Sequence, residues 1–248
     1  MHTLISLTAS DNPLPLMFCA TVFFLSIYCT FAGLVYLLTK QLDRTIEKRV
    51  VTGKQMATEL TNSMRTIGLF GIGMIVPWLL IQNGLASIDV GHTNVQIVLE
   101  CLALIVWNDI HFYFVHRLLH TQHKWFNFKT LHVTHHKSVS ATPFAAYSMS
   151  VSEAILLGSV MPIAMLVRDF SAISLLFLPI WSICINALAH SNCDLFPYAS
   201  QRSCLALVKH HQHHHSHYHG NYSFFFWQLD AFFGSLHNSK KQDTHDTI

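Results

Sequence analysis

Long, mostly apolar runs with few or no charges alternate with polar stretches along this chain. The first run covers residues 14–38, the second residues 67–85 and the third residues 95–115. At 1.5 Å of rise per residue, helices of these lengths reach about 30 Å, which is the thickness of the hydrocarbon core of a bilayer. We therefore predict three membrane-spanning helices, of which the second is kinked at Pro77.

A longer apolar region extends from residue 153 to residue 189 and has one charged break, the sequence RDFS at residues 168–171. This pattern predicts two helices joined by a tight turn. The first helix is short for a full crossing, so a re-entrant path stays open for it. Residues 40–65 carry alternating charges, and we interpret them as one or two surface helices that contribute nothing to the core.

Basic residues predict the orientation of the spans. They lie in residues 40–65, in residues 117–137 and after residue 189, and two apolar runs separate each region from the next. Of the 15 lysines and arginines, only Arg168 lies outside these regions. Because cytoplasmic loops are enriched in Lys and Arg, all three regions should face the cytoplasm. The N-terminus is then outside and the C-terminus inside.

The composition supports a membrane protein. Hydrophobic residues make up 51% of the chain and charged residues 11%, whereas soluble domains carry about 25% charged residues. A net charge of +2 without a basic patch gives no indication of nucleic-acid binding. The six cysteines form no CxxC pair, so we interpret them as free thiols. The N-terminus lacks a positive segment, so no cleaved signal peptide is expected.

Histidine clusters are the main chemical feature. The sequence HRLLH holds two histidines four residues apart, and HVTHH holds three at positions i, i+3 and i+4. The run HHQHHHSHYH contains the HxxHH spacing in two registers, which begin at His210 and His211. On a helix these spacings place the imidazoles on one face, as chelation of a metal requires. The run is internal, so it is not a terminal expression tag.

The number of clustered histidines predicts two metal ions. A single pair at i, i+4 is often structural, but three clusters at one membrane face favour metal binding. Eight histidines exceed the coordination of one ion. Imidazole suits iron, copper, nickel or zinc, and a structural zinc site would use four ligands, usually including cysteines.

These motifs resemble the fatty acid hydroxylase/sterol desaturase superfamily of integral-membrane di-iron enzymes. Members carry a motif like DxxFYxxHRxxH, then HxxHH, then a second HxxHH followed five residues later by NY. The sequence DIHFYFVHRLLH matches the first motif from Asp109 to His120, and TPFAAYS at residues 142–148 is also similar to the family. The resemblance covers roughly residues 95–235.

The resemblance also implies a ligand set. The family spacing to Asn221 and Tyr222 selects the register that begins at His211, and His190 in ALAHSN matches a further family histidine. The resulting metal-ligand candidates are His116, His120, His132, His135, His136, His190, His211, His214 and His215. Many relatives have HPxE after the second cluster, where this chain has SVSE. That departure leaves the substrate subfamily open.

Two carboxylates are candidate catalytic-site residues. Asp109 is expected to orient a ligand histidine through its far N–H, and the alternative is a helix-end charge. Glu153 has either the same kind of role or that of a charge at a helix N-terminus. Residues 224–227 are aromatic and should dock on the membrane or line a substrate path.

Taken together, the runs and motifs predict an all-α, multi-pass transmembrane helical bundle with a cytoplasmic, histidine-rich helical cap that holds a dimetal centre. We divide the chain into an N-terminal transmembrane region of two spans and a basic loop (residues 1–94), a catalytic domain (residues 95–235) and a polar tail (residues 236–248). A multi-pass protein of a bacterial inner membrane is favoured, because the termini are short and carry no retention signal. The endoplasmic reticulum is the alternative.

The resemblance implies an O2-dependent oxidoreductase. Two iron ions held by neutral imidazoles would hydroxylate or desaturate a C–H bond of a sterol-like, fatty acyl or isoprenoid lipid. Zinc is expected as a substitute during purification. The electrons need a separate donor, cytochrome b5-like or ferredoxin-like, because the chain has no haem, flavin or cysteine-cluster motif. The alternative function is a metal transporter or metal-binding protein, and a transporter should place its ligands at mid-membrane.

Overall fold

The fold is almost entirely helical in the part of the chain that the computed structural model describes, residues 2–122 and 126–237. Three of the basic residues used to predict the orientation lie outside the described residues, namely Lys124, Lys240 and Lys241. So does most of the predicted polar tail. The helices are α1 (His2–Ala9), α2 (Leu14–Lys40), α3 (Gly53–Gly73), α4 (Ile75–Gln82), α5 (Asn94–Leu119), α6 (Lys129–His136), α7 (Val151–Gly158), α8 (Val160–Val167), α9 (Ala172–Ala189), α10 (Leu207–His217) and α11 (Gln228–Phe232). Short 3-10 helices η1 (Pro143–Tyr147) and η2 (Cys204–Ala206) and strands β1 (Ile88–Asp89) and β2 (Phe170–Ser171) complete the described elements.

Four helical segments within the described residues are long and apolar enough to cross a membrane. They are α2, the continuous pair α3–α4 (Gly53–Gln82), α5 and α9, and the pair α7–α8 (Val151–Val167) is a shorter apolar segment. The chain is thus a multi-pass membrane protein, and the predicted all-α bundle is confirmed. The predicted hairpin is also present, since α8 and α9 are joined at β2.

The prediction of separate surface helices in residues 40–65 is wrong for residues 53–65. These residues form the first half of α3, which begins after the N-cap Thr52. Glu59 and Ser63 are buried, at 2% and 0% exposure. Thr142 donates a hydrogen bond to Glu59, and Ser63 donates one to the carbonyl of Phe144. The polar side chains therefore hold an inner loop against α3, which a charge pattern alone cannot reveal.

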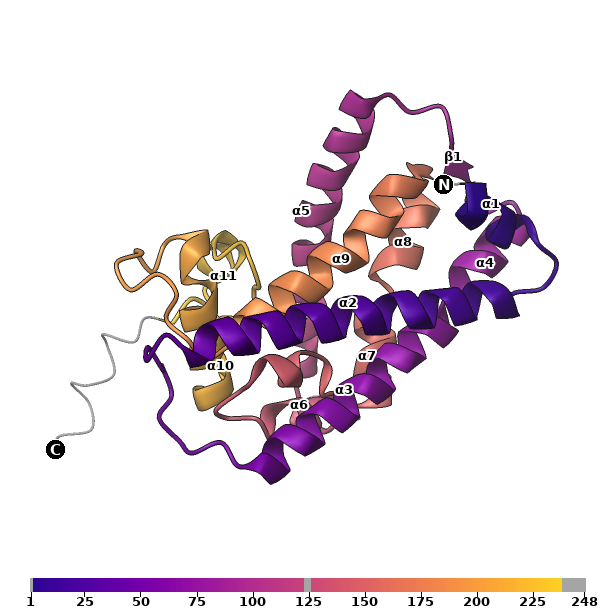
Figure 1. Ribbon diagram of the computed structural model, residues 1–248. Coiled ribbons are helices and arrows are strands. Elements are labelled where there is room, and N and C mark those ends of the chain that lie inside the picture. Colours follow the sequence, from indigo (N-terminus) through magenta and orange to yellow (C-terminus); the bar gives the residue numbers. More distant parts are fainter. Residues whose placement is uncertain (1, 123–125, 238–248) are drawn as a thin grey trace, which may run out of the picture.

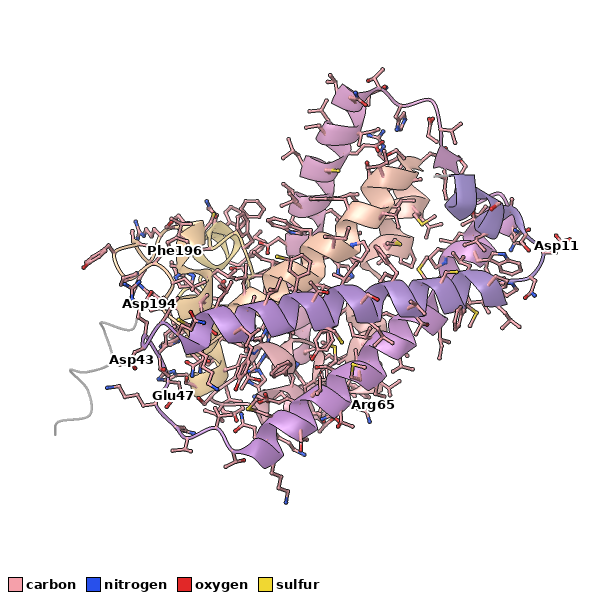
Figure 2. All side chains as sticks on the ribbon, in the orientation of Figure 1. Asp11, Asp43, Glu47, Arg65, Asp194 and Phe196 are labelled. Atoms are coloured by element: carbon pink, nitrogen blue, oxygen red, sulfur yellow. The ribbon has the colours of Figure 1, made fainter. Side chains whose placement is uncertain are left out.

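The helices form two sets that contact each other where α2 packs against α9 and where α4 packs against α8. Figure 1 shows α2 and α3 converging towards α4, while α5, α8 and α9 form the second set. A buried cluster that includes Tyr28, Ile67, Ala146 and Ile183 joins α2, α3, η1 and α9. Figure 2 shows Asp43, Glu47 and Asp194 near one another at one end of the molecule and Asp11 at the opposite end.

Two contacts tie the loops together at opposite ends of the bundle. Thr45, after α2, pairs with Cys193, after α9, in an antiparallel bridge. At the far end β1 pairs with β2 in parallel. There Glu100 is 2% exposed and accepts hydrogen bonds from Arg168, from the Ser171 backbone and from the hydroxyl of Ser174. These bonds replace the water that a buried carboxylate loses.

Candidate metal centre

The nine candidate histidines come together in two adjacent groups, from helices far apart in the sequence. Within each group, one ligand atom of every residue lies within 4.8 Å of the others. All nine are buried except His120, which is partly exposed. Group 1 contains His116, His120, His132, His136 and His214, and group 2 contains His135, His190, His211 and His215.

Each HxxHH motif contributes to both groups. On α6, His132 and His136 belong to group 1, whereas His135 belongs to group 2. On α10 the division is reversed, because His211 and His215 belong to group 2 and His214 to group 1. In both motifs the pair at i, i+4 shares a helical face, and the third ring points to the neighbouring group.

Backbone carbonyls orient several of these rings. A carbonyl can only accept, so each ring donates from Nδ1–H and keeps the lone pair on Nε2. These Nδ1 contacts are His116 to Tyr222 O at 2.9 Å, His190 to Asn186 O at 2.8 Å, His214 to Gly220 O at 2.7 Å and His215 to Ser138 O at 3.0 Å. The arrangement turns the Nε2 lone pairs towards the centres of the groups.

The spacing of the Nε2 atoms fits ligands that share an ion. His190 Nε2 lies 3.0 Å from His211 Nε2 and 3.2 Å from His135 Nε2. In group 1, His136 Nε2 lies 3.1 Å from the Nε2 atoms of both His120 and His214. With metal–nitrogen bonds of about 2.1 Å, neighbouring ligands at right angles are about 3.0 Å apart.

Two further ring atoms support the fit. The Nε2 atoms of His116 and His132 are buried and have no hydrogen-bond partner among the described residues. A buried polar atom without a partner is costly unless something satisfies it. Both atoms belong to group 1, where a metal ion would supply the missing partner.

Burial keeps these imidazoles neutral, which is the form that binds a metal. Burial lowers the pKa of His190 to about 4, although its hydrogen bond to Asn186 raises it. Burial also lowers the pKa of His135, and neighbouring His190 lowers it further. The same direction and main cause hold for His120, His132, His136, His211, His214 and His215.

The two predicted carboxylates lie in different places. Glu153 Oε1 is 2.6 Å from Nδ1 of His132, so it contacts a group 1 ring directly. The carboxylate of Asp109 accepts backbone N–H groups from Phe225 and Phe226, at 2.6 and 2.8 Å. Its hydrogen bonds thus hold the aromatic segment after α10 and go to no histidine ring among the described residues.

Sequence reasoning missed the residues that hold the loop after α10. Asp230 is fully buried and accepts the backbone N–H groups of Tyr222 and Ser223, both at 2.8 Å. Gly220 has a φ of +71°, and an added Cβ would lie 2.8 Å from Ser235 O. Only glycine suits such a position. The glycine and asparagine of the HGNY sequence indicated this turn. The backbone carbonyls that accept hydrogen bonds from the histidine rings cannot be identified from the sequence, because every residue has a carbonyl.

An apolar cavity of about 580 Å³ reaches the histidines from within the bundle. Its walls come from α3, α4, α5, α7, α8 and α9, with residues such as Phe70, Met161 and Leu178. The histidines that line it are His111, His116, His132, His135 and His190. Cavities of 300–1,000 Å³ are typical of sites for small molecules, so both histidine groups face a space suited to an apolar ligand.

Comparison with known proteins agrees with this geometry. The family described as fatty acid hydroxylase matches residues 101–235, more than half of the chain. A Delta(7)-sterol 5(6)-desaturase from Eremothecium gossypii is 32% identical over 100 residues, which cover 38% of this chain and 27% of the relative. The enzyme of the same name from Candida glabrata is 31% identical over 135 residues, which cover 52% of this chain and 35% of the relative. The alignments thus span about a third or less of these curated relatives. No solved structure gives a significant match.

Proposed function

The chain belongs to the fatty acid hydroxylase family, and on this premise we propose that it is a membrane oxidoreductase that hydroxylates or desaturates a lipid C–H bond. The proposed enzyme uses O2 and electrons from a separate donor, cytochrome b5-like or ferredoxin-like. The observation that carries the proposal is the pair of buried histidine groups beside an apolar cavity. Because both relatives are named sterol desaturases, a sterol-like lipid is our preferred substrate over fatty acyl and isoprenoid lipids.

The proposed cofactor is two iron ions, one in each histidine group. Five and four imidazoles supply enough ligands for two ions, and imidazole accepts both iron and zinc. When bound, the iron pair would pass the donor's electrons to O2 and would supply the oxidising power that side chains lack. Zinc is the expected substitute during purification, since such sites generally favour zinc over ferrous iron.

The protein's own residues would position the ligands and the lipid. Backbone carbonyls hold the Nδ1 protons of His116, His190, His214 and His215, which keeps each Nε2 lone pair directed inward. Glu153 holds the Nδ1 proton of His132 in the same way. The apolar walls exclude water and bring a lipid chain to the histidine end of the cavity.

The membrane is proposed to be the endoplasmic reticulum. The preference for a bacterial inner membrane finds no support, because both relatives come from eukaryotes. Cytoplasmic placement of the histidine end remains our proposal and is based on the basic residues around it.

Oxygen consumption tests the function. Protein from cells supplied with iron should consume O2 when given a reductant and a lipid extract, and the rate should track iron and not total metal. Oxygen from labelled O2 enters the lipid in hydroxylation, whereas in desaturation both atoms leave as water.

His120→Ala and His190→Ala should each lower bound metal from about two ions to about one per chain. An iron-loaded protein that consumes no O2 with any lipid would refute the enzyme, and metal flux into vesicles would then support the transporter alternative.

A further inference from the structure

A pair of polar residues interrupts the apolar cavity away from the histidine groups. Asn108 and His111 lie three residues apart on α5, so they share a helical face, and both line the cavity. Each residue is 7% exposed. Neither belongs to group 1 or group 2. Polar residues within a membrane span are costly and are functional candidates by default.

The hydrogen bonds of His111 leave it with a free acceptor. Ser159 Oγ lies 2.7 Å from Leu156 O and donates its only proton there. Ser159 Oγ must therefore accept from His111 Nε2, 3.0 Å away. In the neutral ring Nδ1 then carries a lone pair, and it has no hydrogen-bond partner among the described residues.

Asn108 is also unsatisfied. Within the described part of the chain, its side-chain amide makes no hydrogen bond, although the residue is buried. The amide lines the cavity, where a ligand could reach it. The pair thus presents an acceptor on His111 and both a donor and an acceptor on Asn108. A hydroxyl group complements this set, because it can donate to one residue and accept from the other.

We propose that Asn108 and His111 form a subsite that binds an uncharged oxygen function, a hydroxyl in particular, of the lipid. This inference rests on the proposed function. An anionic ligand group would lack a partner, because no lysine or arginine among the described residues lines the cavity and a buried unpaired charge is costly. The carboxylate of Glu153, which also lines the cavity, already pairs with His132.

The position of the pair also limits the substrate. His111 is five residues and Asn108 eight residues before His116 on the same helix. At 1.5 Å per residue, the subsite lies roughly 7–12 Å along α5 from the level of group 1. The substrate class is therefore a lipid whose hydroxyl group is separated from the oxidised carbon by a distance of this order.

Lipid binding without turnover tests the subsite. Two pairs of radiolabelled probes differ only in one hydroxyl, cholesterol with cholest-5-ene and 1-octadecanol with octadecane. Purified wild-type protein should retain the hydroxylated member of at least one pair about tenfold more tightly, as expected for a buried hydrogen-bonding group. Asn108→Leu and His111→Phe keep the side-chain size and should bring the two members close to equal retention.

A matched control is Leu157→Ala, which alters an apolar lining residue and should change both members of a pair alike. Unchanged metal content in the Asn108 and His111 variants would show that the fold is retained. Equal retention of both members of both pairs by the wild type overturns the subsite, as does a preference that survives both substitutions. A preference in a protein that never consumes O2 supports the subsite while refuting the proposed oxidase.

Discussion

Glu153 Oε1 lies 2.6 Å from Nδ1 of His132, and both side chains are almost completely buried. Ser150 caps α7 by accepting the backbone N–H of Glu153, which places the carboxylate at the start of that helix. The SVSE sequence therefore retains the acid and supplies a helix cap in place of the HPxE element. A carboxylate on the far nitrogen of a metal-binding histidine fixes the ring orientation and raises its basicity.

Replacement of this carboxylate should weaken metal binding. Glu153→Ala should reduce metal affinity by about 10- to 100-fold, because His132 loses the partner that holds its Nδ1 proton. Glu153→Gln should have a smaller effect, since its amide oxygen still accepts that proton. Metal content after dialysis against graded chelator measures the change. Asp43→Asn, at an exposed position, is the control, and wild-type affinity in Glu153→Ala would contradict the prediction.

The register of the histidine run can be tested on neighbouring residues. His211→Ala, His214→Ala and His215→Ala should each lower bound metal and abolish activity, because these rings belong to the two groups. The His210→Ala and His213→Ala proteins should bind as much metal as the wild type. His213 stacks on His217 with ring centroids 4.0 Å apart, and His210 is buried but outside both groups. If His210→Ala loses as much metal as His211→Ala, the assigned register is wrong.

Asp109 should matter for stability. Asp109→Ala removes the acceptor for the N–H groups of Phe225 and Phe226, which should lower the free energy of unfolding by about 1–3 kcal/mol. Asp109→Asn should lose less, because its amide oxygen can still accept one N–H. Denaturant unfolding in detergent measures both variants, with the exposed Asp11→Asn as the control. An Asp109→Ala protein as stable as the wild type would show that other contacts hold this segment.

Cysteine labelling tests the topology. Val50→Cys and Tyr198→Cys should be labelled from one side of the membrane, because the bridge between Thr45 and Cys193 joins the two loops that carry them. Both positions are highly exposed, at 86% and 100%. Gly91→Cys should be labelled from the opposite side, where β1 pairs with β2. The native cysteines must first be replaced by serine.

The sidedness has its own readout. By the charge rule, the Val50 and Tyr198 positions should be cytoplasmic and a reporter at the N-terminus should be outside. Labelling of all three cysteine positions from the same side would contradict the helix arrangement. If Val50→Cys and Tyr198→Cys are labelled from the outside and Gly91→Cys from the cytoplasm, the helix arrangement stands and only the predicted orientation is overturned.

Local patterns predicted the elements that depend on nearby residues. Apolar runs of about 20 residues predict spans because a membrane helix satisfies its own backbone and needs only enough apolar length. The HxxHH spacing predicts rings on neighbouring positions of a helix because the helical repeat is constant. These regularities predicted the bundle and the histidine clusters, whereas the register that begins at His211 and the inclusion of His190 came from the family resemblance.

The same local reasoning failed for residues 53–65. Their polar side chains suggested a solvated surface, but Glu59 and Ser63 are buried against the loop that contains Thr142 and Phe144. A polar residue satisfied by a partner some 80 positions away has the same sequence pattern as one satisfied by water.

The sequence by itself predicted the apolar helical runs and, through its family resemblance, the nine candidate metal-binding histidines. Only the tertiary structure decided that these histidines divide into two groups. His135 and His214 each belong to a different group from the other two histidines of their own HxxHH motif. The tertiary structure also decided that Asp109 holds the backbone of Phe225 and Phe226 while Glu153 holds His132. The reason is physical: hydrophobicity and helix period act along the chain, whereas the partner of a lone pair or an N–H depends on which distant segments pack together.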